Sequence, residues 1–202
     1  ILTSERAELT DPRVRELAEA RLSTRLGGGV DPEIGYMTSS AFSPAGVHGL
    51  IEDSYRTNVL IASHCFYDAS HFYGESVFPD FWEWLQFLGL KSVEHDFDWY
   101  LKEHPNFSKT ERRIIRGFTA KYPSVRLLPA DVSNLQLVEE GIDAVITVFG
   151  SVGHEFPALG VPVINCSLNN PHIEWDFNFH AADIKSLDSL IREIPRLKVK
   201  PG

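Results

Sequence analysis

Residues 143–165, DAVITVFGSVGHEFPALGVPVIN, decide the fold class of this chain. An apolar run at 144–148 breaks at the glycine turn GSVG of residues 150–153, and a short helix with Glu155 in its first turn follows. A second apolar run, 161–165, comes after that helix. A strand, a turn, a helix and another strand in this order form the repeating unit of a parallel α/β sheet.

The same alternation continues on both sides of this stretch. Further apolar runs predict strands at residues 59–63, 99–102 and 125–128. Helices are expected at residues 81–88, after the capping residues Ser108 and Ser133, and from Ile184 until Pro195 ends the pattern. We therefore predict a Rossmann-like α/β domain over residues 57–202, in which a parallel sheet carries helices on both faces.

The segment before residue 57 has a different character. Asp11 followed by Pro12 is typical of a helix start, and apolar residues recur at helical intervals until three glycines at 27–29 end the helix. Residues 30–56 contain scattered Gly, Pro and Ser without periodicity. We expect residues 1–56 to form a helical arm and a connecting segment.

The composition excludes several classes of protein. With 202 residues, of which 43% are hydrophobic, the chain is long enough to bury a full core. Its net charge of -9 would repel a nucleic-acid backbone, so we expect no nucleic-acid partner. No apolar run approaches the roughly 20 residues that a membrane-spanning helix needs. Cys65 and Cys166 have no CxxC or CxxH neighbour and are expected to be buried reduced thiols.

The start of the chain carries no targeting signal. It begins with Ile1 rather than Met, and no basic segment precedes an apolar one in the manner of a signal peptide. We expect a piece of a longer cytoplasmic protein, with any membrane attachment residing in parts outside this sequence.

The glycine turn at 150–153 is the first candidate for ligand binding, because ligands of open parallel sheets bind at the carboxyl ends of the strands. Its glycines let backbone N–H groups approach a phosphate, and Ser151 adds a hydroxyl. Glu155 suits the hydroxyl groups of a ribose or sugar. The alternative is a plain glycine turn with a glutamate that complements the helix dipole.

The turn, together with ALGVPVI at 158–164, resembles the donor-site core of GT-B glycosyltransferases and of the related nucleotide-sugar 2-epimerases. LKEHPN at 101–106 and NVLIASHCFYD at 58–68 resemble the bacterial capsule-synthesis branch, which includes Kdo and sialic-acid transferases. The resemblance implies the C-terminal domain of a GT-B enzyme at the inner face of the cell membrane. It also implies that this enzyme transfers a sugar from a nucleotide-sugar donor to a polysaccharide or glycolipid acceptor in capsule or surface polysaccharide synthesis.

The same resemblance assigns roles to individual residues. Catalytic roles fall on His64, Asp68 and His104. Contacts to the nucleotide sugar fall on Ser63, Pro105, Pro129, Gly150, Ser151, Val152, Gly153, Glu155 and Asn169. GT-B enzymes normally work without a bound metal, so we expect no metal and no other cofactor.

Each assignment has a structural alternative. The His104-Pro105 pair also serves as a strand terminator, and the loop at 64–71 as a hydrogen-bonded connection. His64, Asp68 and His71 are also conceivable metal ligands, but their spacing fixes no coordination geometry.

Two other functions remain open. A nucleotide-sugar 2-epimerase ranks second, because such enzymes usually have a second acid beside the turn and here Phe156 follows Glu155. A binding module without turnover ranks third. The acidic pair with glycine that supplies the base in some sialyltransferases is absent, so we expect the catalytic base outside this sequence.

Overall fold

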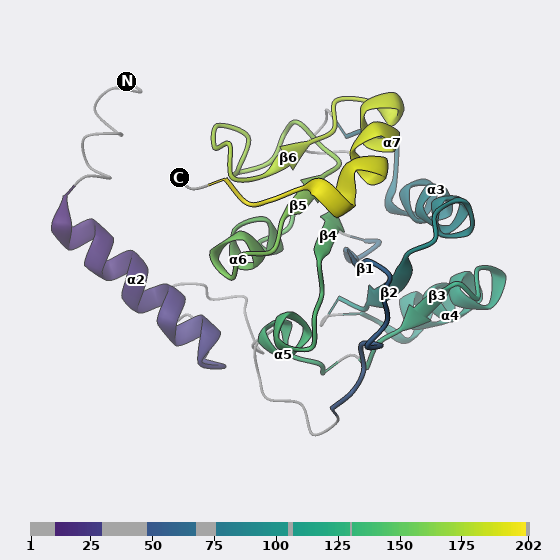
Figure 1. Ribbon diagram of the computed structural model, residues 1–202, viewed down its shortest axis with the longest axis horizontal. Helices are drawn as coiled ribbons and strands as arrows, with labels where there is room; N and C mark the ends of the chain where they lie inside the picture. The colour runs from purple at the N-terminus through teal and green to yellow at the C-terminus, as the bar shows by residue number, and fades with distance from the viewer. Residues whose placement is uncertain (1–10, 30–47, 68–75, 105–106, 130, 201–202) are drawn as a thin grey trace.

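The computed structural model describes residues 11–29, 48–67, 76–104, 107–129 and 131–200, which form a six-stranded sheet with helices on both faces (Figure 1). The strands are β1 (Asn58–Ala62), β2 (Asp98–Lys102), β3 (Val125–Leu127), β4 (Ala144–Thr147), β5 (Val163–Asn165) and β6 (Phe179–His180). The helices are α2 (Pro12–Leu26), α3 (Phe81–Glu94), α4 (Lys109–Lys121), α5 (Asn134–Glu139), α6 (Val152–Ala158), α7 (Ile184–Glu193) and the 3-10 helix η1 (Ile194–Arg196).

The strand order is β3-β2-β1-β4-β5-β6, and every pairing is parallel. At the centre, Leu60 of β1 lies between Tyr100 of β2 and Val145 of β4. The chain builds outward from β1 to β3 and then crosses to β4 on the other side of β1. This is the order of the doubly wound Rossmann fold, so the predicted fold class is confirmed.

Two apolar clusters sandwich the sheet. Helices α3, α4 and α7 cover one face with Trp84, Phe118 and Leu187. Helices α5 and α6 cover the other face with Leu137 and Phe156. All residues of β1, β2 and β4 are buried, because both faces of the sheet are covered, and this explains their continuous apolar runs in the sequence.

The predicted helix starts agree closely with the structure, but α3 ends at Glu94, six residues beyond its predicted end. Ser108 forms a capping box with Glu111 at the start of α4, and the Ser133 side chain accepts from the Leu135 N–H at the start of α5. The last predicted strand was two residues too long, because β5 begins only after Pro162, which has no N–H to donate. The two-residue strand β6 was missed because it is too short to show any alternation.

The N-terminal arm is a helix from Pro12, as predicted, but the described residues leave part of its apolar side uncovered. Val14 and Leu17 are exposed. Farther along the chain, the N–H groups of residues 49–51 donate to the Glu140 carboxylate, and Ile51 packs into the core. The domain boundary near Thr57 stays a prediction. None of the described helices is long and apolar enough to cross a bilayer.

Candidate functional site

The carboxyl ends of β1 and β4 lie side by side at the centre of the sheet, where the direction of winding changes. From β1 the chain passes to α3 on one face, and from β4 it passes to α6 on the other (Figure 1). Loops that leave neighbouring strands toward opposite faces open a crevice, and ligands of open α/β sheets bind there. The residues around this point form the candidate site.

The stretch at 150–153 leads from β4 into α6 as predicted, but its last two residues, Val152 and Gly153, already belong to the helix. Ser151 is the N-cap residue, but its exposed side chain makes no capping hydrogen bond. Gly153 has no positive φ, and a Cβ atom there would lie 2.4 Å from Cδ2 of His172. The structure therefore gives Gly153 a packing role, whereas the sequence had suggested close approach of a ligand to its backbone.

Glu155 is only 1% exposed and has two protein partners. One carboxylate oxygen pairs with the guanidinium of Arg25, which α2 brings to α6. The other accepts from Nδ2 of Asn134, the first residue of α5, at 3.2 Å. A hydroxyl group of a ligand would have to share or replace one of these contacts, so α2 takes part in the environment of this carboxylate.

Lys102 extends the same buried network. Its Nζ donates to Oδ1 of Asn134 at 2.5 Å, so the Asn134 side chain bridges Lys102 and Glu155. Desolvation lowers the pKa of Lys102 to about 8, and the charge of Glu155 opposes this shift. A buried lysine with a lowered pKa is a feature of many functional sites.

His64 is buried at the end of β1, against our expectation of a residue that lines the cleft. Its ring stacks on Phe81 with centroids 4.9 Å apart, and Nε2 accepts from the Val148 N–H at 3.2 Å. Burial lowers the pKa of His64 to about 3, and His104 adds to the shift. The imidazole is therefore neutral near pH 7, which favours the alternative of a hydrogen-bonded structural loop over a catalytic role.

The other predicted residues have mixed placements. His104 is half-buried just past β2, and the Ser63 hydroxyl donates to the Lys102 carbonyl at 2.6 Å. Val152 packs against the core on the α6 face. The remaining predictions fall into two groups: Pro129 and Asn169 lie exposed after β3 and β5, and Asp68, His71 and Pro105 lie outside the described residues.

The segment between β5 and β6 packs across the start of α6. The Nε2 atom of His172 lies 3.3 Å from the carbonyl oxygen of Gly150, and the Asn178 side chain donates to the carbonyl of Gly153. Farther out, Trp175 is exposed and stacks on Phe177. Only Asn169 of this segment was predicted at the site, whereas the contacts to the glycine turn come from His172 and Asn178.

Sequence reasoning missed Arg25, Lys102 and Asn134. The only indication in the sequence was the position of Lys102 at the end of an apolar strand. A lysine in that position is equally typical of a side chain that extends into solvent. The expectation of buried thiols was right for Cys166 and wrong for Cys65, which is partly exposed and donates to Glu111 at 2.9 Å because its loop lies at the rim of the sheet.

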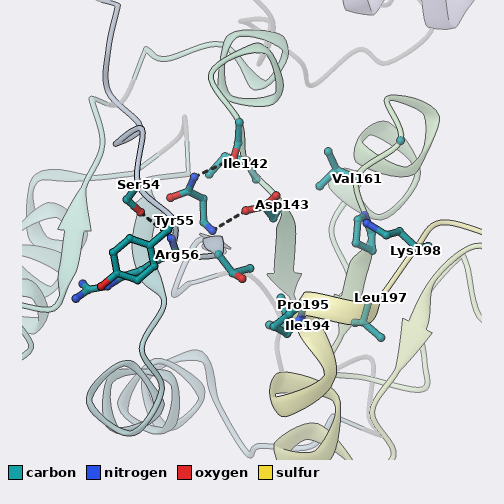
Figure 2. Close-up of a pocket in the computed structure, with 15 residues that line it drawn as sticks. Ser54, Tyr55, Arg56, Ile142, Asp143, Val161, Ile194, Pro195, Leu197 and Lys198 are labelled. Carbon is teal, nitrogen blue, oxygen red and sulfur yellow. Dashed lines mark hydrogen bonds between the residues drawn. The ribbon is translucent and has the colours of Figure 1, made fainter.

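Two polar features lie away from the switch point. Glu94, His95 and Asp188 are close enough to share a metal ion, but the Lys91 ammonium already pairs with Glu94 at 2.5 Å and with Asp188 at 2.6 Å. A cavity of about 480 Å³ opens at the amino ends of the strands, the edge of the sheet opposite to the candidate site (Figure 2). Arg56, Asp143 and Lys198 are among the residues that line it.

Comparisons with known proteins support the fold. No family model and no curated protein matches the chain. Among solved structures, the chain is similar to UDP-GlcNAc 2-epimerase from Neisseria meningitidis bound to UDP-GlcNAc, with a TM-score of 0.52 and 15% sequence identity. The match covers 72% of this chain and 37% of that chain.

Fold and topology thus define a Rossmann-like domain of the kind found in a GT-B-fold nucleotide-sugar enzyme. At 15% identity the likeness concerns the fold. The chain spans little more than a third of the length of the epimerase chain that it resembles.

Proposed function

We propose that this chain is the nucleotide-sugar-binding domain of an enzyme with the GT-B fold. The observation that carries the proposal is the glycine turn of residues 150–153 at the switch point of a doubly wound parallel sheet. Ligands of such sheets bind at this point. The similar epimerase structure contains UDP-GlcNAc, which supports the same class of ligand here.

For the activity of the whole protein, we propose 2-epimerisation of a nucleotide sugar ahead of sugar transfer. The similarity to an epimerase favours this activity over the capsule-type transferase that the His104-Pro105 motif suggested. The transferase remains the second candidate, because Glu155 has Phe156 rather than a second acid beside it.

Both reactions break the bond between the anomeric carbon and the nucleotide phosphate. Either one requires stabilisation of the negative charge that the leaving phosphate acquires, and fixed donors and cations usually supply the largest part of such catalysis. The backbone N–H groups of residues 150–152 and the imidazole of His104 are our candidates for this role, since the Gly153 N–H already donates to the Gly150 carbonyl. Because the chain corresponds to only part of the epimerase, the acid and base of the reaction are expected on a second domain.

A thermal-shift panel tests the binding proposal. We expect UDP or UDP-GlcNAc to raise the melting temperature more than CMP, GDP or CDP do, because a ligand that binds only the folded state stabilises it. The shift should persist in EDTA, since we expect no metal at this site. If none of these ligands raised the melting temperature at millimolar concentration, the proposal would be wrong.

A further inference from the structure

Lys102 is a buried cation without an ionic partner among the described residues. It is 8% exposed, and its Nζ has one hydrogen-bond acceptor there, Oδ1 of Asn134. Buried charges in proteins are usually paired, because the loss of hydration is otherwise uncompensated. The side chain therefore needs an explanation that the fold alone does not provide.

The surroundings of Lys102 carry an excess of positive charge. Arg25 and Lys102 flank a single carboxylate, Glu155, which already pairs with Arg25. This excess contrasts with the chain as a whole, whose net charge is -9. Because two buried cations surround only one carboxylate, one positive charge is not balanced. An anion from outside the chain would balance it.

The position of Lys102 fits a ligand contact. It is the last residue of β2, beside Ala62 at the end of β1, and two residues before His104. Its side chain lies on the face of the sheet that α5 and α6 cover. There it is close to two polar residues in the first turns of these helices, Asn134 of α5 and Glu155 of α6. We propose that Lys102 is an anion-binding residue whose ammonium group contacts the phosphate of the ligand; this inference rests on the proposed function.

The proposal predicts that proton uptake accompanies binding. The free site has a lysine whose pKa is lowered to about 8 by burial, so at pH 8 about half of the molecules lack this proton. A phosphate beside Nζ raises the pKa, and about half a proton per ligand should be taken up. The other titratable groups that face the network are Glu155 and His154 on α6, Arg25 on α2, and His172 in the loop after β5. Burial lowers the pKa of both imidazoles below the ordinary value of 6.5, so they stay neutral at pH 8.

Calorimetry with inorganic pyrophosphate and UDP, in two buffers of different ionisation enthalpy at pH 8, measures this uptake. We expect wild type to take up protons with both ligands. Lys102→Met should bind pyrophosphate at least tenfold more weakly, without uptake, and should melt no lower than wild type because a buried unpaired charge is removed. Lys102→Arg should bind without uptake, because a guanidinium stays protonated at pH 8.

Lys91 provides the matched control, since it is a largely buried lysine with two carboxylate partners on α3 and α7. Lys91→Met should lower the melting temperature and leave pyrophosphate affinity and proton uptake unchanged. Wild-type affinity for pyrophosphate in Lys102→Met, or binding of UDP to wild type without proton uptake, would overturn the role of Lys102 while leaving the nucleotide site in place. Failure of wild type to bind UDP at all would instead contradict the proposed function.

Discussion

His64 packs against two aromatic rings at the end of β1, those of Phe81 and Phe149, at centroid distances of 4.9 and 4.8 Å, and these two rings also contact each other. Its Nε2 lies 3.2 Å from the Val148 nitrogen, which donates to it, and 2.9 Å from the Thr147 hydroxyl. The loss of hydration on burial is the main reason why the imidazole stays neutral.

A pH-dependent stability follows from this arrangement. The pKa of His64 is about 3 in the folded protein, below the ordinary value of 6.5, so its contribution to stability is complete above pH 6.5 and is lost as the pH falls toward 3. Between pH 6.5 and 4.5 this residue alone should reduce the free energy of unfolding by about 2.3 kcal/mol. Urea unfolding of wild type and His64→Gln at both pH values measures the effect. His64→Gln has no imidazole to titrate, so its free energy of unfolding should change less between the two pH values, by this amount. Equal changes in both proteins would exclude the contribution of His64.

Gly153 offers a second test at the residue scale. A Cβ atom there would lie 2.4 Å from Cδ2 and 2.7 Å from Nε2 of His172, so Gly153→Ala should lower the free energy of unfolding by roughly 1 to 3 kcal/mol. Gly117 in α4 has open space where a Cβ atom would lie, so Gly117→Ala should raise the free energy of unfolding by about 0.5 to 1 kcal/mol. Chemical denaturation separates the two variants. Truncation of the ring in Gly153→Ala/His172→Ala should remove most of the added penalty, and an undiminished penalty would mean that the ring is not the cause.

At the scale of elements, a buried ion pair joins α2 to α6. Arg25 and Glu155 lie 130 positions apart in the sequence and are both buried. Most of the other charged side chains of α2 are exposed, as are Val14 and Leu17. The docking of this helix is therefore concentrated at its C-terminal end (Figure 1).

Removal of one member of this pair should be costly. Arg25→Met leaves the Glu155 carboxylate buried with only an amide partner, and we expect a loss of about 3 to 5 kcal/mol in the free energy of unfolding. Arg25→Met/Glu155→Met removes both charges and should recover much of that loss. Arg15→Met, which breaks an exposed pair with Glu19, is the control and should change stability by less than about 1 kcal/mol. A single variant as stable as wild type would show that α2 does not dock through Arg25.

The elements were predictable from the sequence to the extent that local patterns determine them. β1 and β4 were predicted to within one residue at each end, since the sheet is covered on both faces and its strands are apolar throughout. The caps of α4 and α5 were predictable because the capping residues lie within a few positions of the groups that they bind.

The buried network was not predictable for the opposite reason. Arg25, Lys102, Asn134 and Glu155 belong to four elements, and only the tertiary structure brings them together. The same holds for His172, whose packing on Gly153 depends on a loop 19 positions away. Sequence patterns predicted Glu155 as a candidate site residue but could not identify the partners that surround it.

At the scale of the whole molecule, the proposed function assigns ligand binding to this domain and catalysis to a second one. The chain corresponds to 37% of the length of the epimerase that it resembles, so we expect it to bind a nucleotide sugar without turning it over. Catalysis then requires the domain that supplies the acid and base. Full-length protein is therefore the material on which the two candidate activities must be distinguished.

The two activities differ in what happens at C2 of the sugar. Epimerisation by elimination and re-addition of the nucleotide breaks the C2–H bond and returns a proton from solvent, whereas transfer displaces the nucleotide at the anomeric carbon and leaves the C2–H bond intact. In D₂O, we expect full-length protein incubated with UDP-GlcNAc to yield a nucleotide sugar that is heavier by one deuterium at C2, together with its 2-epimer.

Mass spectrometry and proton NMR of the recovered nucleotide sugar measure both products. The 202-residue chain alone, at the same concentration, is the control and should give neither, although UDP should still raise its melting temperature. Because no acceptor takes part in epimerisation, deuterium should enter without any added polysaccharide. The opposite outcome is consumption of UDP-GlcNAc only in the presence of an oligosaccharide acceptor, with no deuterium in the unreacted UDP-GlcNAc. The protein would then be a glycosyltransferase, and the capsule-type resemblance of the His104-Pro105 motif would be the better guide to its activity.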